Sequence, residues 1–356
     1  MHRALSLAER GRGRTTPNPM VGAVVVSDEG VVVGRGAHLT AGGSHAEIIA
    51  LADAGNRARG ATLYCTLEPC CHIGRTGPCA PRVVDAGIRR AVIACMDPNP
   101  LVAGGGIAHL RAHGVEVTVG VMREEAEALN RPFFTRMRLG RPLVTMKAAL
   151  SLDGWMAAAP GVRTPLTGAA ANRRVHRERA EVDAIAVGSG TILADDPLLT
   201  PRGAFRERPL ARIVFDSRLR TPVSARLLST LAAGPVIIMS TPSAAANAPD
   251  RVGALVAAGT AVELIAGDSR LHGALERLAA MGINSLVVEG GVALHRALWD
   301  ADLVDRIELF VAARALGAAG MEWLTTPVFS SSRVTGLTTE LLGDDALIEA
   351  YVHRPH

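Results

Sequence analysis

The first third of the chain alternates short β-branched runs with segments in which apolar residues have helical spacing. The runs MVGAVVV and VVVGRGAH flank the turn residues SDEG and predict a β-hairpin. The next segment, HAEIIALADAG, has the period of a helix that ends at Gly55. Strands and helices then alternate as far as VEVTVGV. This order predicts an α/β/α sandwich over residues 1–122.

A second series of strands follows a charged helical stretch. Residues 123–142 predict a connector, because a proline at position 142 disfavours helix at the residue before it. Strand patterns resume with PLVTMKAALSLDG and continue through ARIVFDS, GPVIIMST and NSLVVEGG. Two final runs around GDDA predict an antiparallel hairpin at a sheet edge, and TPSAAANAPD predicts a loop over residues 241–250. We expect a second α/β domain over residues 143–356.

Composition narrows the class of protein. A chain of 356 residues suits two domains, and aromatic residues at 3% leave the cores to Ala, Val, Leu and Ile. No run of eighteen apolar residues and no signal peptide occur, so we expect a cytoplasmic protein without a membrane span. The 38 Lys and Arg residues form no dense run. The net charge of +4 therefore suits a small anionic substrate as well as it suits nucleic acid.

Four of the five cysteines lie within a few dozen residues of His45 and Glu47. Thiols in a reducing compartment bind metals or catalyse reactions more often than they form disulfides. His45 and Cys79 open predicted helices and Cys70 follows a predicted strand, so all three can meet at one sheet edge. Zinc-dependent base deaminases have this arrangement, in which zinc activates water and a glutamate such as Glu47 transfers its proton.

The cysteine spacing departs from the general deaminase signature. Ile73 stands where a C-x-x-C motif would place its second cysteine, and the next thiol is Cys79. A closed structural zinc site with Cys71 or His72 as fourth ligand is one alternative, but such a site needs no Glu47.

Two further alternatives concern function. The first is a deaminase of nucleic-acid bases, against which stand the few aromatic residues and the lack of a basic stripe. The second is a non-catalytic binding module that zinc stabilises. Cys65 and Cys95 lie inside predicted strands, where we expect them to be small buried apolar residues.

Motifs from both halves resemble one family. TTPNPMVGAVVV, HAE, TLEPCCHIGRTGPC and DPNPLVAGGG resemble the deaminase half of the bifunctional riboflavin-biosynthesis deaminase/reductases. KAALSLDG, GSGTILADDPLLTPR, RIVFDS and VVEGG are similar to their reductase half. The long spacing P-C-x₈-C is also the family's own. The resemblance implies a cytidine-deaminase-like α/β/α sandwich followed by a dihydrofolate-reductase-like α/β domain, with one Zn²⁺ and NADPH as cofactors.

The resemblance also implies roles for individual residues. In the deaminase half these are zinc ligation by His45, Cys70 and Cys79, proton transfer by Glu47, and pyrimidine contacts from Asn18 and His38. In the reductase half, NADPH contacts are implied for Ala149, Thr191, Asp195, Ser217, Gly291, Val292, Ala293, Leu294, His295, Arg296 and Ala297. Substrate contacts there are implied for Arg163, Arg179, Leu199, Arg202 and Glu289.

The residues of the second half carry less specific signals by themselves. Gly290 and Gly291 stand between a strand and a helix, where they can form either a diphosphate cradle or a plain tight turn. Asp195 in ILADDP can be a helix cap instead of a cofactor contact.

Charged residues of the second half suggest further contacts. Ser217 and Arg218 follow a strand and suit the 2′-phosphate that distinguishes NADPH from NADH. Lys147 and Asp153 are candidates for polarising the sugar carbon or holding the ring.

One loop departs from the family pattern. In PGVRTPLT, Arg163 replaces a small substrate-contacting residue and Pro165 replaces an aromatic beside the cofactor. An alternative is therefore a protein in which only the deaminase is active, or whose reductase has changed cofactor preference. For partners we expect a phosphorylated pyrimidine and a homo-oligomer, with no nucleic acid and no membrane.

Overall fold

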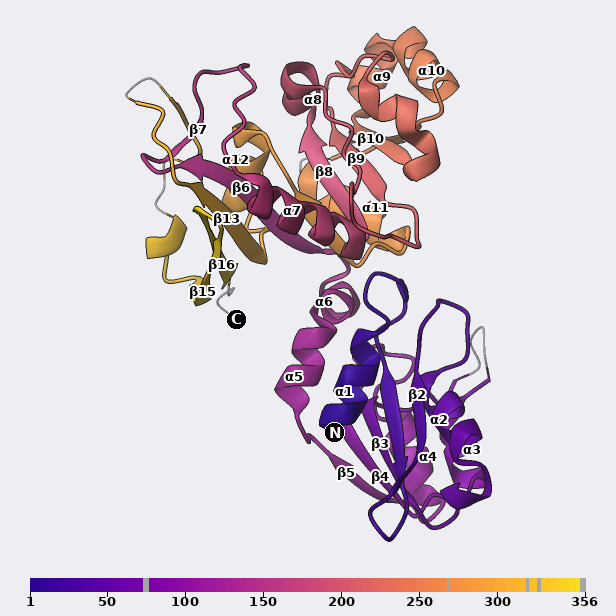
Figure 1. Cartoon of the computed structure of the whole chain (residues 1–356). Helices are drawn as coiled ribbons and strands as arrows, with labels where there is room; N and C mark the ends of the chain where they lie inside the picture. Colours follow the sequence, from indigo (N-terminus) through magenta and orange to yellow (C-terminus); the bar gives the residue numbers. More distant parts are fainter. Residues whose placement is uncertain (73–76, 268, 318–319, 325–327, 353–356) are drawn as a thin grey trace. The chain divides into compact units, whose positions relative to one another are not determined.

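The structure is a computed structural model, shown in Figure 1. It describes residues 1–72, 77–267, 269–317, 320–324 and 328–352. The chain divides into two compact units, Met1–Gly140 and Arg141–His356. In the described ranges, no helix has both the length and the apolar content needed to cross a membrane.

The first unit is built on a five-stranded sheet with the order β2-β1-β3-β4-β5. The hairpin predicted near the N-terminus pairs β1 with β2, β1 pairs antiparallel with β3, and the remaining pairs are parallel. The strands are β1 (Gly22–Val26), β2 (Val32–Ala37), β3 (Thr62–Leu67), β4 (Arg90–Cys95) and β5 (Glu116–Val119).

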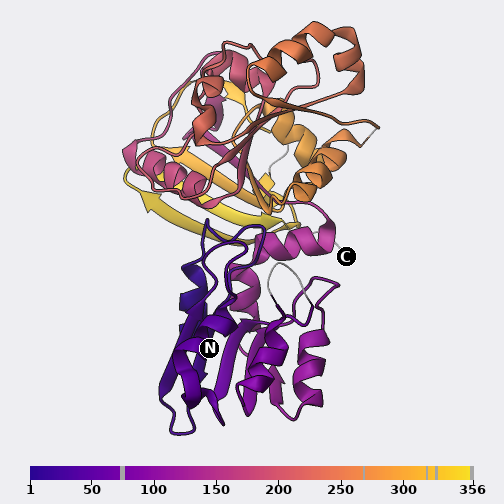
Figure 2. The ribbon, with the colours of Figure 1, turned by 90° about the vertical axis from the view of Figure 1, so that its right-hand side faces the viewer.

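Helices cover both faces of this sheet (Figures 1 and 2). They enclose a core of mostly small aliphatic side chains, which includes the buried Cys65 and Cys95 as expected. The helices are α1 (His2–Glu9), α2 (Ala46–Ala54), the short η1 (Gly55–Ala58), α3 (Cys79–Asp85), α4 (Gly105–Ala112), α5 (Arg123–Leu129) and α6 (Arg131–Leu139).

Glycines in the hairpin let helix α2 approach the sheet closely. A Cβ atom on Gly36 would lie 2.0 Å from the carbonyl oxygen of Ala46, and one on Gly34 would lie 2.2 Å from that of Ala50. No larger residue fits at these positions without moving helix backbone. The glycines therefore set the depth at which α2 holds its first turn.

Helices α5 and α6 occupy the stretch that the sequence predicts as a connector, and they group with the first unit. Phe133 and Phe134 of α6 and Ala126 of α5 belong to its core. At the junction of the two helices, Asn130 accepts a hydrogen bond from Met20 N at 2.7 Å and donates one to Met20 O at 2.8 Å. This pair ties α6 to the loop before β1.

The second unit contains a nine-stranded sheet with the order β11-β10-β9-β8-β12-β6-β13-β16-β15, and a small sheet of β14 and β7. Strands β11 to β13 in this order are parallel, and β13, β16 and β15 pair antiparallel. The strands are β6 (Leu143–Ser151), β7 (Trp155–Ala157), β8 (Ala184–Gly188), β9 (Ala211–Phe215), β10 (Val236–Ser240), β11 (Ala261–Leu264), β12 (Ser285–Val288), β13 (Arg306–Ala312), β14 (Met321–Glu322), β15 (Val334–Leu342) and β16 (Asp345–Val352).

The C-terminal hairpin of β15 and β16 forms the sheet edge that the sequence predicts, and its long strands are the yellow arrows of Figure 2. Helices lie on both faces of the parallel part of the sheet, as its buried strands require. They are α7 (Ala169–Glu181), α8 (Ser189–Asp195), η2 (Arg226–Ala233), α9 (Pro242–Asn247), α10 (Pro249–Ala257), α11 (Arg270–Ala280), α12 (Val292–Asp300) and η3 (Val328–Ser330).

The prediction of a loop over residues 241–250 was wrong. Helix α9 begins there, because Thr241 caps it by accepting a hydrogen bond from Ala244 N at 3.1 Å. Pro242 follows as the first helical residue, a position that suits proline, and the alanines after it are strong helix formers.

Candidate active sites

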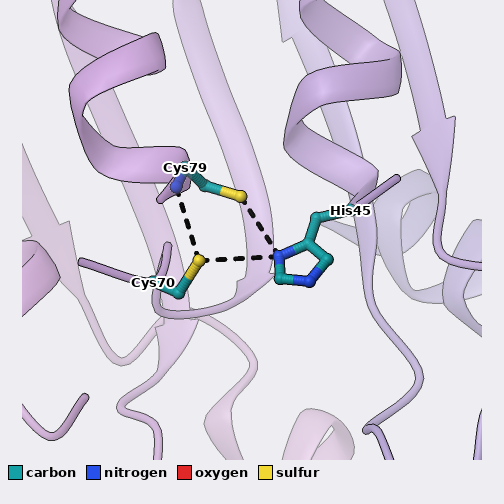
Figure 3. A group of neighbouring side chains, drawn as sticks. All are labelled: His45, Cys70 and Cys79. Atoms are coloured by element: carbon teal, nitrogen blue, oxygen red, sulfur yellow. Dashed lines mark hydrogen bonds between the residues drawn. The ribbon is translucent and has the colours of Figure 1, made fainter. Parts of the chain in front are cut away.

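Three side chains of the first unit converge between two helices and the end of a strand (Figure 3). His45 caps the N-terminus of α2, Cys79 is the first residue of α3, and Cys70 lies in the loop after β3. The Nδ1 atom of His45 lies 3.2 Å from Cys79 Sγ and 3.5 Å from Cys70 Sγ. The structure thus brings together the three ligands predicted from the sequence.

The donor set fits a zinc ion. Tetrahedral zinc with bonds of about 2.0–2.3 Å to nitrogen and sulfur separates its ligand atoms by roughly 3.5–3.8 Å, close to the distances found here. Among the described residues the cluster holds these three ligands within 4.8 Å of one another. Neither Cys71 nor His72 joins it, so nothing here supports the closed four-ligand alternative.

Backbone hydrogen bonds fix the two thiols across the long insertion between them. The amides of Cys79 and Ala80 donate to the carbonyl oxygen of Cys70 at 2.9 and 3.0 Å. The Cys79 amide also lies 3.4 Å from Cys70 Sγ. Hydrogen bonding from the Cys79 thiol lowers the pKa of Cys70 to about 4, and the same bond raises the pKa of Cys79. Residues 73–76 of the insertion, Ile73 among them, lie outside the described residues.

Glu47 lies in the first turn of α2, two residues after His45. Its side chain is only 3% exposed and lines the same cavity as His45 and Cys70. Burial raises the pKa of Glu47 to about 7. A carboxyl group placed so beside a metal site can accept and return a proton during a reaction.

A cavity of about 320 Å³ adjoins the cluster. The two predicted pyrimidine contacts line it, and Asn18 Nδ2 lies 3.1 Å from His38 Nε2. His38 Nδ1 lies 3.1 Å from the carbonyl oxygen of Ser44. Burial lowers the pKa of His38, so its neutral ring donates to Ser44 and accepts from Asn18.

Sequence reasoning missed several residues of this cavity. Asp97 and Asn99 line it from the DPNP motif, and burial raises the pKa of Asp97 to about 6. An acidic side chain two residues after the buried strand β4, at the carboxyl end where ligands bind in α/β sheets, is the sequence signal for this contact. Helix α6 supplies three more lining residues, Phe133, Arg136 and Met137, from a stretch expected to be a connector.

The second unit has a larger cavity of about 1240 Å³. The predicted residues Ala149, Arg163, Thr191, Asp195, Arg202, Ser217, Glu289, Gly291, Val292, Ala293, Leu294 and Ala297 line it, together with Lys147. The predicted residues Arg179, Leu199, His295 and Arg296 do not.

The Gly290-Gly291 turn supports one wall of this cavity. A Cβ atom on Gly290 would lie 3.2 Å from Thr191 Oγ1, and Gly291 has a φ of +89° that favours glycine. Gly291 caps helix α12, so the first amides of that helix face the cavity region. Helix amides in this position suit a diphosphate. Asp195 ends helix α8 and does not cap a helix start.

Arg179 lies behind Glu289. Its Nε and Nη2 atoms donate to the two carboxylate oxygens of Glu289 at 2.8 and 2.5 Å, and Nη1 donates to Thr200 O at 3.1 Å. Burial raises the pKa of Glu289, but the charges of Arg179 and Lys147 outweigh burial and lower it to about 2. The cavity therefore presents an ionised Glu289 whose orientation Arg179 holds.

The side chains of His295 and Arg296 point away from the cavity. His295 is fully buried, with Nε2 3.1 Å from Val288 O and Nδ1 accepting from Trp323 Nε1 at 2.9 Å. Arg296 is exposed on helix α12. A continuous run of residues was predicted as cofactor contacts, but a helix turns only one face toward a ligand. Leu199, 2% exposed, is part of the core.

Several charged residues differ from expectation. Asp153 accepts hydrogen bonds from the amides of Leu316 and Gly317 at 3.0 and 2.8 Å and does not line the cavity. Arg218 does not line it either, whereas Arg220, two residues further along, does, with Nη2 2.9 Å from Ser189 Oγ.

His176 is a further lining residue that sequence reasoning missed. Its Nδ1 accepts a hydrogen bond from the backbone amide of Arg202 at 3.2 Å. Its position three residues before Arg179 on one helix was an available signal.

The loop at residues 160–167, whose sequence departs from the family pattern, contributes to the cavity. Arg163 and Pro165 both line it, and the charge of Arg163 partly offsets the burial that raises the pKa of Asp195. Arg314 Nη1 donates to the carbonyl oxygen of Pro165 at 3.1 Å and fixes the loop.

Comparisons with known proteins agree with both sites. Residues 1–95 match the family model of the cytidine and deoxycytidylate deaminase zinc-binding region. Residues 142–348 match that of the RibD C-terminal domain. A riboflavin biosynthesis protein RibD of Aquifex aeolicus is 42% identical over 317 residues, which are 89% of this chain and 87% of that protein. The chain belongs to the RibD family.

Other RibD proteins extend the match over nearly the whole chain. The Escherichia coli protein is 40% identical over 92% of this chain and 90% of its own length. The solved structure of Acinetobacter baumannii RibD has a TM-score of 0.89 at 34% identity and covers 99% of this chain and 98% of that one.

A Thermotoga maritima structure described as a diaminohydroxyphosphoribosylaminopyrimidine deaminase/5-amino-6-(5-phosphoribosylamino)uracil reductase has a TM-score of 0.84 at 31% identity. It covers 99% of this chain and 97% of that one.

The family match confirms the two predicted domains, a deaminase-like sandwich followed by an α/β domain of the RibD C-terminal type. The protein is an enzyme of riboflavin biosynthesis that combines a zinc-dependent deaminase with an NADPH-dependent reductase. Because the RibD match spans the reductase domain, nothing found supports the alternative of an active deaminase alone.

Proposed function

We propose that the first unit removes the 2-amino group of 2,5-diamino-6-(5-phosphoribosylamino)pyrimidin-4-one by hydrolysis. The second unit then reduces the ribosyl group of the resulting 5-amino-6-(5-phosphoribosylamino)uracil to ribityl. The observation that carries this proposal is the cluster of His45, Cys70 and Cys79 with the buried Glu47 in one cavity. The RibD relatives support the second step.

In the deamination reaction, the three ligands of the cluster bind zinc and Glu47 transfers protons. Zinc bound by the histidine and two cysteines supplies the Lewis acidity that makes water nucleophilic at neutral pH. Glu47 takes one proton from the attacking water and delivers it to a ring nitrogen. It then moves the second proton, from the hydroxyl group added to the ring carbon, to the amino group that leaves as ammonia. Its burial excludes bulk water from the carboxyl group, and the first turn of α2 fixes its position beside His45.

Asn18 and His38 orient the pyrimidine. Their mutual hydrogen bond uses Asn18 Nδ2, which leaves Asn18 Oδ1 to accept a hydrogen bond from a ring amino group. The bond from His38 to Ser44 O fixes the imidazole next to His45, whose ring centroid lies 5.5 Å away.

The large cavity of the second unit holds NADPH and the phosphorylated substrate together. NADPH supplies the hydride. Of the predicted contacts, those that line the cavity bind it: Ala149, Thr191, Asp195, Ser217, Gly291, Val292, Ala293, Leu294 and Ala297. Arg163, Arg202 and Glu289 bind substrate, Lys147 faces the sugar, and Arg179 acts through Glu289.

A coupled assay tests both halves. The purified chain receives the diaminopyrimidine ribosyl phosphate, ammonia release is measured, and NADPH is then added and its oxidation followed. We expect stoichiometric zinc and both signals. Ammonia release without NADPH oxidation would overturn the reductase assignment, and the absence of both zinc and ammonia would overturn the deaminase assignment.

The variant Glu47→Gln tests the proton-transfer role. It keeps the size of the side chain but removes the base, so kcat for ammonia release should fall at least ~10²-fold. Zinc content, measured by atomic absorption, should stay at the wild-type value because Glu47 is not a ligand. Unchanged kcat, or loss of zinc, contradicts the role.

We further propose a cytoplasmic homo-oligomer that binds neither nucleic acid nor membranes. Both cavities have the size of small-molecule sites, which supports a small substrate. Salt-dependent retention on tRNA or single-stranded DNA would contradict the absence of nucleic-acid binding, and a monomeric mass by light scattering would contradict the homo-oligomer.

A further inference from the structure

Helix α6 forms a wall of the deaminase cavity. Phe133, Arg136 and Met137 all line it, and their spacing of three and four residues places them on one helix face. We propose that Arg136 binds the phosphate of the substrate in the deaminase site. This inference rests on the proposed function, since it concerns where that phosphorylated substrate is held.

The position of Arg136 ties it to the pyrimidine loop. Its Nη2 atom donates to the carbonyl oxygen of Pro17 at 3.3 Å, and the next residue is Asn18. The same loop is fixed to the start of α6 by the two hydrogen bonds between Asn130 and Met20. Asn18, which contacts the pyrimidine ring, and the guanidinium group of Arg136 are therefore held at a fixed distance from each other. That distance suits a substrate that carries its phosphate at one distance from its ring.

The deaminase cavity is acidic, so binding a phosphorylated substrate there requires a positively charged side chain. Its acidic lining residues are Glu47, Glu68 and Asp97, and the substrate adds a phosphomonoester that carries close to two negative charges. Among the described lining residues, Arg136 is the single lysine or arginine. A phosphate held elsewhere along the described wall would face carboxyl groups without a fixed positive charge.

The acidic residues do not need Arg136 as a counter-charge. The Glu68 carboxylate accepts hydrogen bonds from the amides of Gly104 and Ile107 at 3.0 and 3.1 Å, and so it binds the N-terminus of α4. Asp97 accepts from the amide of Asn99 at 2.8 Å. Guanidinium groups recognise phosphate through paired hydrogen bonds, a geometry that lysine does not offer.

Arg138 provides a matched control on the same helix. It is exposed, does not line the cavity, and lies over the ring of Phe134 with its Cζ atom 4.9 Å from the centroid. Its Nη2 atom is 3.6 Å from Glu127 Oε1. Arg138→Gln removes the same charge from α6 without changing the cavity.

The experiment compares two substrates in the full-length zinc-loaded protein. Ammonia release is measured with the ribosyl phosphate and with its dephosphorylated nucleoside, for wild type, Arg136→Gln, Arg136→Lys and Arg138→Gln. Inhibition of the same reaction by ribose 5-phosphate gives a second readout. Glutamine keeps an amide donor for Pro17 O, which separates the loss of charge from the loss of the loop contact.

We expect Arg136→Gln to raise KM for the phosphorylated substrate, and the inhibition constant of ribose 5-phosphate, by roughly 10- to 100-fold. KM for the nucleoside should change less than about threefold. Arg136→Lys should fall between wild type and Gln, and Arg138→Gln should match wild type.

Two results would overturn the inference. One is unchanged discrimination between the two substrates in Arg136→Gln, and the other is an equal loss for both substrates, which indicates a structural role. If Arg136→Gln loses zinc, the test is made with Arg136→Lys instead. A wild-type ratio of the two KM values in Arg136→Lys would then overturn the proposal. Wild-type protein that releases no ammonia from either substrate would instead refute the proposed function.

Discussion

Two buried carboxyl groups of the reductase unit face each other, Glu178 on α7 and Glu308 on β13. Both residues are less than one-tenth exposed. Arg306 Nη1 lies 3.0 Å from Glu308 Oε1. Burial, followed by the charge of Glu308, raises the pKa of Glu178 well above its ordinary value. Glu178 therefore keeps its proton in the folded protein.

This proton makes stability depend on pH. Above the ordinary carboxyl pKa of 4.5 the unfolded chain releases the proton that the folded chain retains, so stability falls as pH rises from there toward the raised pKa. The slope reaches about 1.4 kcal/mol per pH unit. Glu178→Gln should flatten it between about pH 5 and 8, as measured by thermal unfolding. The exposed control Glu340→Gln should leave the slope in place, and a steep slope in Glu178→Gln would contradict the raised pKa of Glu178.

Residue-level prediction succeeded where spacing alone determines geometry. A histidine capping one helix, a cysteine opening the next and a cysteine after a strand meet at a sheet edge in almost any such fold, so the zinc ligands were accessible from sequence. The buried bonds of His295 were not, because they involve Val288 and Trp323 from separate elements. The same holds for Arg179, whose partner Glu289 lies 110 residues further along the chain.

At the scale of elements, the contact between the first hairpin and helix α2 determines where the zinc ligand lies. Gly36→Ala places a Cβ atom against backbone, 2.0 Å from Ala46 O and 2.6 Å from Ala50 N. We expect α2 to shift, with a loss of stability of about 2 kcal/mol or more and weaker zinc binding in a chelator competition. Wild-type zinc affinity in Gly36→Ala would contradict this.

Gly253 gives the contrasting control for the same substitution. It lies inside helix α10, and a Cβ atom there meets nothing within 4 Å. Gly253→Ala should therefore raise stability by about 0.5–1 kcal/mol, because alanine loses less backbone entropy in a helix.

Element boundaries were predicted well where the hydrophobic period is strong and poorly where small residues dominate. The strand, Gly-Gly and helix order of β12 and α12 was predicted correctly, since the short run Leu286–Val288 is followed by Glu289 and then by two glycines. Helix α9 was missed because its alanines carry no apolar period. The cap from Thr241 that decides it is visible only in the structure.

At the scale of the whole molecule, the two units have separate cores. Among the described residues, the buried apolar clusters of 1–140 and 141–356 share no member. Removing zinc should therefore affect one unit only, because metal binding adds folding free energy to the domain that holds the ligands. Chelation should lower the unfolding temperature of the deaminase unit and abolish ammonia release.

The reductase provides the internal control for that experiment. Oxidation of NADPH with the deaminated intermediate as substrate should persist in the chelated protein, and added zinc should restore ammonia release. A parallel loss of both activities would show that the units do not fold independently.

The wall that α6 gives to the deaminase cavity has a consequence for dividing the gene. A fragment that stops at codon 122 would lack Arg136 and the hydrogen bonds of Asn130. It would also expose to solvent the core residues that Phe133 and Phe134 cover. A fragment that continues through Gly140 keeps all of them. Splitting the enzyme into two genes, or fusing its deaminase to another protein, should therefore preserve the helix that looked like a linker.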